Sequence, residues 1–166
     1  YEVLVERLAA AGFHQYEVAN FARDNSPGPA TVAGEPSGLP RIPSHACRHN
    51  IGYWRGLDSL GVGPSASEYV DGVRSRNWSN TELWLTQLAR GRRAKEFAEA
   101  LSPLARAGEL AAFGLRMNRG WDFEGFEERS GFDLRAHWRR EIDSLVRRGW
   151  GIESNTHFRL SPTGFR

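Results

Sequence analysis

The sequence predicts an α/β fold in the form of an α+β fragment, ending in a small helical, winged-helix-like domain. Three observations support this prediction. The first part of the chain, residues 1–23, has the pattern helix, glycine, strand, which is the closing half of an α/β repeat. Residues 24–44 are rich in proline and glycine, so they separate this repeat from the rest of the chain. Residues 102–166 have the patterns of several helices followed by two short strands.

The N-terminal repeat is predicted from the spacing of its apolar residues. Leu4, Val5 and Leu8 are spaced for one face of a helix, and Gly12 follows as a stop signal, so residues 1–12 are predicted to be helical. Residues 13–21 are predicted to form one strand, because aromatic and β-branched side chains occur there without glycine or proline. Residues 24–44 are predicted to be a mobile surface loop.

The middle of the chain alternates short apolar runs with glycine. Residues 59–66 predict a short strand that runs into a glycine-rich turn, where the backbone can approach a ligand closely. Residues 68–76 predict a second strand or hairpin arm. Residues 81–88 predict a short helix, because Trp84, Leu85 and Leu88 share one face.

The last third predicts helices followed by a hairpin. Ser102 and Pro103 are typical of a helix start, and this helix is expected to continue to about Asn118. Residues 123–129 predict a short helix and residues 134–146 a strongly amphipathic one. Strands are predicted at residues 150–153 and 157–160, and a further helix is expected to begin at Ser161.

Composition restricts the classes of function. The 22 basic and 20 acidic residues give a net charge of +2, which is too close to neutral to indicate a nucleic-acid partner. Cys47 is the only cysteine, so a disulfide within the chain is excluded and a reducing, cytoplasmic location is expected. No apolar run approaches the roughly 20 residues of a membrane-spanning helix. The chain opens and stops inside helical patterns, so both ends are expected to be cuts in a longer protein.

Four blocks of residues carry a resemblance to a known family. They are YEVANFAR at residues 16–23, HNIGYW at 49–54, LGVGPSA at 60–66, and Glu109 with GLR at 114–116 and Gly120. In this order they resemble the C-terminal portion of the radical S-adenosylmethionine heme chaperones and the oxygen-independent coproporphyrinogen III oxidases. The block HNIGYW matches the family pattern H-N-x-x-Y-W in full.

The resemblance implies a partial (β/α) barrel that binds S-adenosylmethionine and a [4Fe–4S] cluster through a C-x-x-x-C-x-x-C loop. Cys47 stands alone here, so this chain is expected to lack the cluster ligands and not to be catalytic by itself. The expected parts are the last barrel helix and strand (1–23), the loop (24–44), a barrel-closing segment (45–92) and the C-terminal domain (93–166). The implied function is a heme chaperone that delivers heme to acceptor proteins, some of them at the membrane. The alternative is an oxidase that decarboxylates coproporphyrinogen propionates.

The resemblance also implies site residues. His49 is the expected ligand of heme iron, beside Asn50, with Tyr53 and Trp54 packing against the porphyrin and Arg48 and Arg55 pairing with its propionates. The other interpretation makes His49 and Asn50 hydrogen-bonding groups of the barrel mouth and Trp54 a core residue. The backbone of the glycine turn is the expected contact for the adenosyl group, through Gly61, Gly63, Pro64, Ser65 and Ala66.

Three further groups of residues have less specific patterns. Cys47 with His45 and His49 could bind metal, although the spacing matches no standard zinc pattern. The acidic residues Asp122, Glu124, Glu127 and Glu128 are expected to be a solvated helix face. The arginines Arg139, Arg140, Arg147 and Arg148 fit either ordinary surface charges or, in a winged-helix nucleic-acid-binding module, phosphate contacts. No nucleic acid is expected as a partner.

Overall fold

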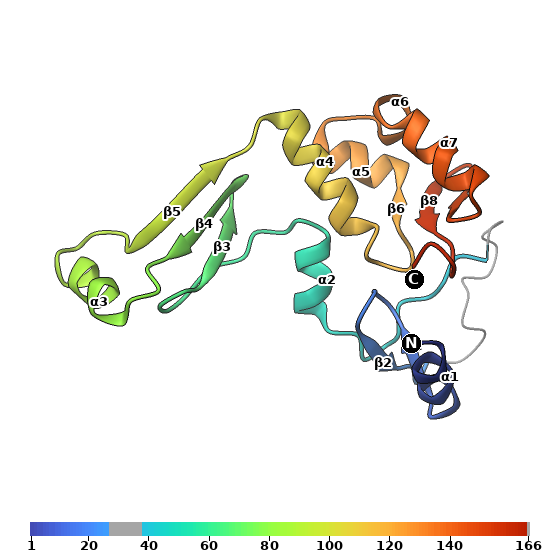
Figure 1. Cartoon of the computed structure of the whole chain (residues 1–166), viewed down its shortest axis with the longest axis horizontal. Helices are drawn as coiled ribbons and strands as arrows, with labels where there is room; N and C mark the ends of the chain where they lie inside the picture. Colours follow the sequence, from blue (N-terminus) through green and yellow to red (C-terminus); the bar gives the residue numbers. More distant parts are fainter. Residues whose placement is uncertain (27–37, 166) are drawn as a thin grey trace.

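The computed structural model describes residues 1–26 and 38–165, so most of the predicted loop 24–44 lies outside the described residues. Figure 1 shows an extended arrangement, with a three-stranded sheet at one end and most of the helices at the other. Among the helices of the described ranges, none is long and apolar enough to cross a membrane.

The N-terminal part is a helix followed by a hairpin. Helix α1 spans Glu2–Ala10, and strands β1 (Phe13–Gln15) and β2 (Phe21–Arg23) pair antiparallel, with His14 opposite Ala22. The prediction of one strand over residues 13–21 was therefore wrong. Glu17, whose side chain is fully buried, accepts hydrogen bonds from Ala19 N and from Asn20 Nδ2, and these local bonds turn the chain back.

Helix α2 (Arg48–Trp54) follows and packs on this hairpin. A small core forms from Tyr16, Ala22 and Met117, with Ile51 and Trp54 of α2 packed against it. This core joins the N-terminal residues to the segment after residue 114. Backbone bonds reinforce the junction, since Val18 N donates to Arg116 O and Asn118 N donates to Tyr16 O.

The three-stranded sheet is antiparallel in the order β3-β4-β5, with bounds Ser67–Val70, Val73–Asn77 and Lys95–Ala100. Strands β3 and β4 form a tight hairpin, because Asp71 and Gly72 both have positive φ as a two-residue turn requires. Helix α3 (Thr81–Ala89) agrees with the helix predicted over residues 81–88, and the side chain of Asn80 before it accepts from Leu83 N. The predicted strand over residues 59–66 was wrong, since only Ser59 forms a bridge, with Tyr69.

Strand β5 was not predicted, because its sequence KEFAEA alternates weakly and has low strand propensity. It lies in the range 93–166 but pairs with β4 of the range 45–92. The division of the chain into domains stays a prediction.

The C-terminal part consists of helices around a second small sheet. Its helices are α4 (Pro103–Gly114), α5 (Phe123–Ser130), α6 (Leu134–His137) and α7 (Arg139–Arg147), and its strands are β6 (Trp121–Asp122), β7 (Gly151–Glu153) and β8 (His157–Leu160). The strands pair antiparallel in the order β6-β8-β7. The predicted helix starts at Pro103 and near Phe123, and the predicted strands near the end of the chain, are confirmed.

Two predicted details of this part were wrong, and a third is left open. Helix α4 ends at Gly114, four residues before Asn118. The single helix expected over residues 134–146 is interrupted at Trp138, whose φ of −122° and ψ of 30° are not helical. At Ser161 the backbone bond from Phe165 N to Ser161 O closes one helical turn, and the Ser161 hydroxyl accepts from Gly164 N; the helix expected to begin there stays a prediction.

The main core lies between α4, α5, α7 and this sheet. Its buried members include Leu110, Trp121, Phe126, Ile142 and Phe158. Trp121 donates its indole N–H to Leu110 O at 3.1 Å, so the polar edge of this buried ring is satisfied.

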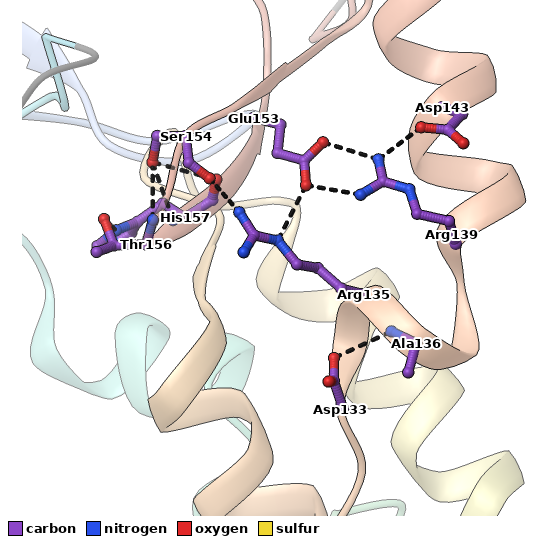
Figure 2. A network of polar contacts seen from close by, with 9 residues as sticks. All are labelled: Asp133, Arg135, Ala136, Arg139, Asp143, Glu153, Ser154, Thr156 and His157. Atoms are coloured by element: carbon purple, nitrogen blue, oxygen red, sulfur yellow. Dashed lines mark hydrogen bonds and ion pairs between the residues drawn. The ribbon is translucent and has the colours of Figure 1, made fainter.

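A polar network fixes the end of β7 to helices α6 and α7, as Figure 2 shows. Nη1 and Nη2 of Arg139 donate to Glu153 at 2.8 and 2.7 Å, and Arg135 Nε donates to the same carboxylate at 3.0 Å. Arg139 also pairs with Asp143 at 2.7 Å. Arg139, one of the four arginines considered for phosphate contact, is therefore paired with two carboxylates of its own chain.

Candidate functional site

Helix α2 carries the H-N-x-x-Y-W block and divides it between two faces. Ile51 and Trp54 pack toward the core around Tyr16. His49 and Tyr53 are four residues apart, so they share the opposite face, and both are exposed. The block therefore presents one imidazole and one phenol ring to the outside of the described structure.

Trp54 is held as a core residue. Its ring meets the Phe113 ring edge-on at a centroid distance of 6.1 Å, and the guanidinium of Arg116 lies over it at 4.2 Å. These contacts match the interpretation in which Trp54 is structural. Its predicted packing against a porphyrin stays a prediction.

His49 differs from the neighbouring histidine. His45 lies 2.9 Å from Asn25 Nδ2, whereas the ring of His49 has no hydrogen bond or ion pair with any described residue. Cys47 is exposed, and its backbone N–H donates to the Tyr16 hydroxyl. Within residues 1–26 and 38–165, no group of three or more His, Cys, Asp or Glu side chains could hold a metal ion.

The two arginines that flank the block have different environments. Arg48 is exposed at the first position of α2. Arg55 instead stacks on the buried Trp121 ring at 4.5 Å, and its burial lowers the pKa of the guanidinium from its usual value. Arg55 thus packs against the core, and its pairing with a propionate stays a prediction.

The glycine turn is held by the adjacent hairpin. Asn77, itself buried, donates through Nδ2 to Gly61 O at 3.1 Å and to Gly63 O at 2.8 Å. A Cβ on Gly61 would lie 2.7 Å from Ser67 O, so close backbone packing alone requires glycine there. Gly63 and Ser65 both have positive φ.

The amides of this turn are partly used within the protein. Gly61 N donates to Glu68, Ser65 N to Trp78 O, and Ala66 N to Gly63 O. Contact of Gly61, Gly63, Pro64, Ser65 and Ala66 with an adenosyl group stays a prediction.

A cavity of about 500 Å³ lies between the two helices α2 and α4 and the sheet β3-β4-β5. Of the predicted site residues only Tyr53 lines it. The chain reaches it directly after α2, where Gly56 has a φ of +65° and a Cβ would lie 2.5 Å from the Leu110 side chain. The other apolar residues of its wall are Leu57, Tyr69, Phe97, Leu110 and Phe113.

Charged residues border this cavity on the sheet side. Arg74 pairs with Glu99 at 2.5 Å and also contacts Glu109, which connects β4 to helix α4. Arg76 pairs with Glu96 at 3.0 Å, and Lys95 pairs with Glu68 at 2.8 Å. The hydrogen bond from Lys95 is the main reason that the pKa of the Glu68 carboxyl is below its usual value.

Sequence reasoning missed most of this cavity. Phe97 lies on the strand that was not predicted, and Arg106 and Phe113 lie on a helix that was interpreted only as part of the C-terminal domain. Glu109 was noted only as part of a family block. The one signal in the sequence was an aromatic residue, Phe97, among the charged and small residues of KEFAEA.

Comparisons with known proteins agree with this arrangement. Residues 101–166 match the family model of the HemN C-terminal domain. The heme chaperone HemW of Synechocystis is 34% identical over 122 residues, which cover 69% of this chain and 24% of that protein. The chain belongs to the HemN and HemW family. The resemblance carried by the four sequence blocks is thereby confirmed.

Other family members extend the match. The heme chaperone HemW of Lactococcus lactis is 27% identical over 99% of this chain and 38% of its own length. A mitochondrial radical S-adenosyl methionine domain-containing protein 1 of Danio rerio is 31% identical over 76% of this chain and 26% of its length. The chain thus spans between about a quarter and two fifths of these relatives.

A solved structure shows the same fold. It is coproporphyrinogen III oxidase (HemN) from Escherichia coli, a radical SAM enzyme, which matches 98% of this chain and 37% of its own length with a TM-score of 0.60 and 12% identity. The mixed α/β character predicted for the fragment is confirmed. At this identity the match concerns the fold alone.

The residues of this chain do not fit a [4Fe–4S] cluster. Such a cluster takes thiolate ligands, and the sequence offers the single Cys47. This chain by itself therefore cannot supply the ligands of such a cluster.

Proposed function

We propose that the chain is the C-terminal part of a radical S-adenosylmethionine protein of the heme pathway, which binds heme and delivers it to acceptor proteins. The relatives named heme chaperone support this role at 27–34% identity. In the intact protein, S-adenosylmethionine and the cluster are held mainly by residues outside this chain. The oxidase alternative is supported by likeness of fold alone, at 12% identity.

In this proposal the parts of the chain have distinct roles. The N-terminal helix and hairpin are the end of a partial barrel, and the glycine turn lies on the adenosyl side. The helices α4 to α7 with the sheet β6-β8-β7 form a winged-helix-like domain. The protein acts in the cytoplasm, with acceptors that include membrane proteins.

The state of His49 is the observation that carries the proposal. Its imidazole is exposed and has no bonding partner among the described residues, so it can act as an axial ligand of heme iron without breaking a contact. Tyr53 lies one helical turn away on the same face and lines the cavity. A flat macrocycle can therefore contact the ring of Tyr53 while its iron meets His49.

Hemin titration of the 166-residue chain tests this role. We expect His49→Ala to remove the shift of the Soret band and to weaken hemin binding at least about tenfold, the loss of one coordination bond. His45→Ala is the matched control, because it removes the nearest other exposed imidazole, and it is expected to leave the Soret band unchanged. Equal Soret shifts in the unmodified chain and His49→Ala would remove His49 from the ligand role.

A further inference from the structure

The cavity between α2, α4 and the sheet has aromatic residues on both its helical and its sheet side. We propose that this cavity holds the ring of a carboxylated tetrapyrrole, and that Arg106 pairs with one of the ring's carboxylates. The inference rests on the proposed function and assigns the binding of the ring to residues outside the H-N-x-x-Y-W block, apart from Tyr53.

The walls have the composition that a flat apolar ligand requires. The helices contribute the rings of Tyr53 and Phe113, and the sheet contributes the rings of Tyr69 and Phe97. The volume of about 500 Å³ is within the range of small-molecule sites and is sufficient for most of a tetrapyrrole ring. Phe97 is 47% exposed and Tyr53 is 43% exposed, so a bound ring would bury aromatic surface that this chain leaves open.

The charges around the cavity single out Arg106. Arg74 and Arg76 are neutralised by glutamates of the sheet and of α4. Arg106 has no ion pair with any acidic side chain of the described ranges. A carboxylate placed beside this guanidinium gains a charge-assisted hydrogen bond without displacing an existing partner.

The position of Arg106 places that carboxylate at the edge of the cavity. Arg106 Nη1 lies 2.7 Å from where a Cβ of Gly72 would be, so the guanidinium lies against the β3–β4 turn. Arg106 also lines a neighbouring polar hollow, together with Asp58, Asp71, Glu128 and Arg129. A ligand whose body is apolar and whose rim carries carboxylates matches this boundary, with the ring in the apolar cavity and the carboxylate at Arg106.

Two separate contributions to heme binding follow. The cavity and Arg106 bind the ring, whereas His49, which does not line the cavity, contributes only through the iron of a heme that lies against Tyr53 at the edge of the cavity. A ring without iron should therefore still bind, because its binding depends on the cavity and not on His49.

Metal-free protoporphyrin IX provides the test. Its fluorescence is titrated with the 166-residue chain, Phe97→Ala, Arg106→Gln and His49→Ala. We expect Phe97→Ala and Arg106→Gln each to weaken binding about five- to tenfold, the loss of one aromatic contact or one charge-assisted bond. His49→Ala is expected to leave this affinity unchanged.

Matched controls separate the site from general effects. Leu88→Ala removes an apolar side chain of similar exposure outside the cavity, and Arg140→Gln removes an exposed arginine of α7. Both are expected to bind like the unmodified chain. With protoporphyrin dimethyl ester, which has no carboxylate, Arg106→Gln should bind as well as the unmodified chain.

The outcomes distinguish this inference from the proposed function. Hemin binding that depends on His49, combined with protoporphyrin binding that is insensitive to both Phe97→Ala and Arg106→Gln, overturns the inference and leaves the proposed function standing. Absence of hemin and protoporphyrin binding in the unmodified chain overturns both. Circular dichroism checks that Phe97→Ala is folded. If Phe97→Ala does not fold, the affinity of Arg106→Gln for protoporphyrin decides the inference, because Arg106 is at an exposed position.

Discussion

The buried carboxylate of Glu17 gives the sharpest prediction about the fold. Its side chain is fully buried, and it accepts from Ala19 N at 2.7 Å and from Asn20 Nδ2 at 2.5 Å. Arg116, which precedes Met117 of the same small core, pairs with the Glu17 carboxylate at 3.4 Å. We predict that Glu17→Ala destabilises the chain by releasing the turn between β1 and β2 and its junction with residues 115–118.

The magnitude follows from the three contacts. Hydrogen bonds to a charged group contribute about 1.5–3 kcal/mol each, but Asn20 is half-buried and can bond to water instead. The guanidinium of Arg116 is 37% exposed, so its pairing contributes about 0.5 kcal/mol. Removing the carboxylate also relieves the cost of its burial, so we expect a net loss of about 2–3 kcal/mol in the free energy of unfolding.

Urea unfolding followed by tryptophan fluorescence measures this loss. Glu17→Gln keeps one acceptor oxygen and loses the charge, so it should cost about 1 kcal/mol. Glu127→Ala is the control, because Glu127 is an exposed glutamate of α5, and it should stay within about 0.5 kcal/mol of the unmodified chain. A free energy of unfolding for Glu17→Ala that matches this control would refute the reasoning.

Two further predictions concern the C-terminal part. In Gly114→Ala the new Cβ would lie 1.9 Å from Trp121 Nε1, so the buried ring must move and lose its bond to Leu110 O. We expect the free energy of unfolding, measured with heat or urea, to fall by about 2–4 kcal/mol. Gly108→Ala on the same helix has its nearest neighbour at 3.7 Å and should be neutral or stabilising, and equal effects of the two substitutions would contradict the steric argument. Bonding to Arg139 lowers the pKa of the Glu153 carboxyl below its usual value of 4.5, so the contribution of this carboxylate to stability is present above that pH and is lost as the pH falls through the lowered pKa. The free energy of unfolding should therefore fall more steeply below about pH 4.5 in the unmodified chain than in Glu153→Gln, and parallel curves would show that the pair contributes nothing.

Local sequence signals were sufficient where the controlling interactions are local. The helix start at Ser102 and Pro103, the shared face of Trp84 and Leu88 in α3, and the apolar spacing of Ile142 depend only on neighbouring residues, and the structure has helices at all three places. The four blocks also identified the family, because they are patterns of residue identity. The face shared by His49 and Tyr53 follows from their spacing on a helix.

The remaining features depend on residues that are far apart in the sequence. The local bonds of Glu17 to Ala19 and Asn20 turn the predicted strand into a hairpin, but the burial of its carboxylate also depends on distant residues, among them Arg116, which pairs with it from 99 positions away. Strand β5 has a weak strand propensity of its own and forms because its backbone pairs with β4 along the length of that strand. The cavity and its single unpaired arginine exist only because α2, α4 and the sheet converge there, and no local pattern encodes which charges find partners when distant segments pack together.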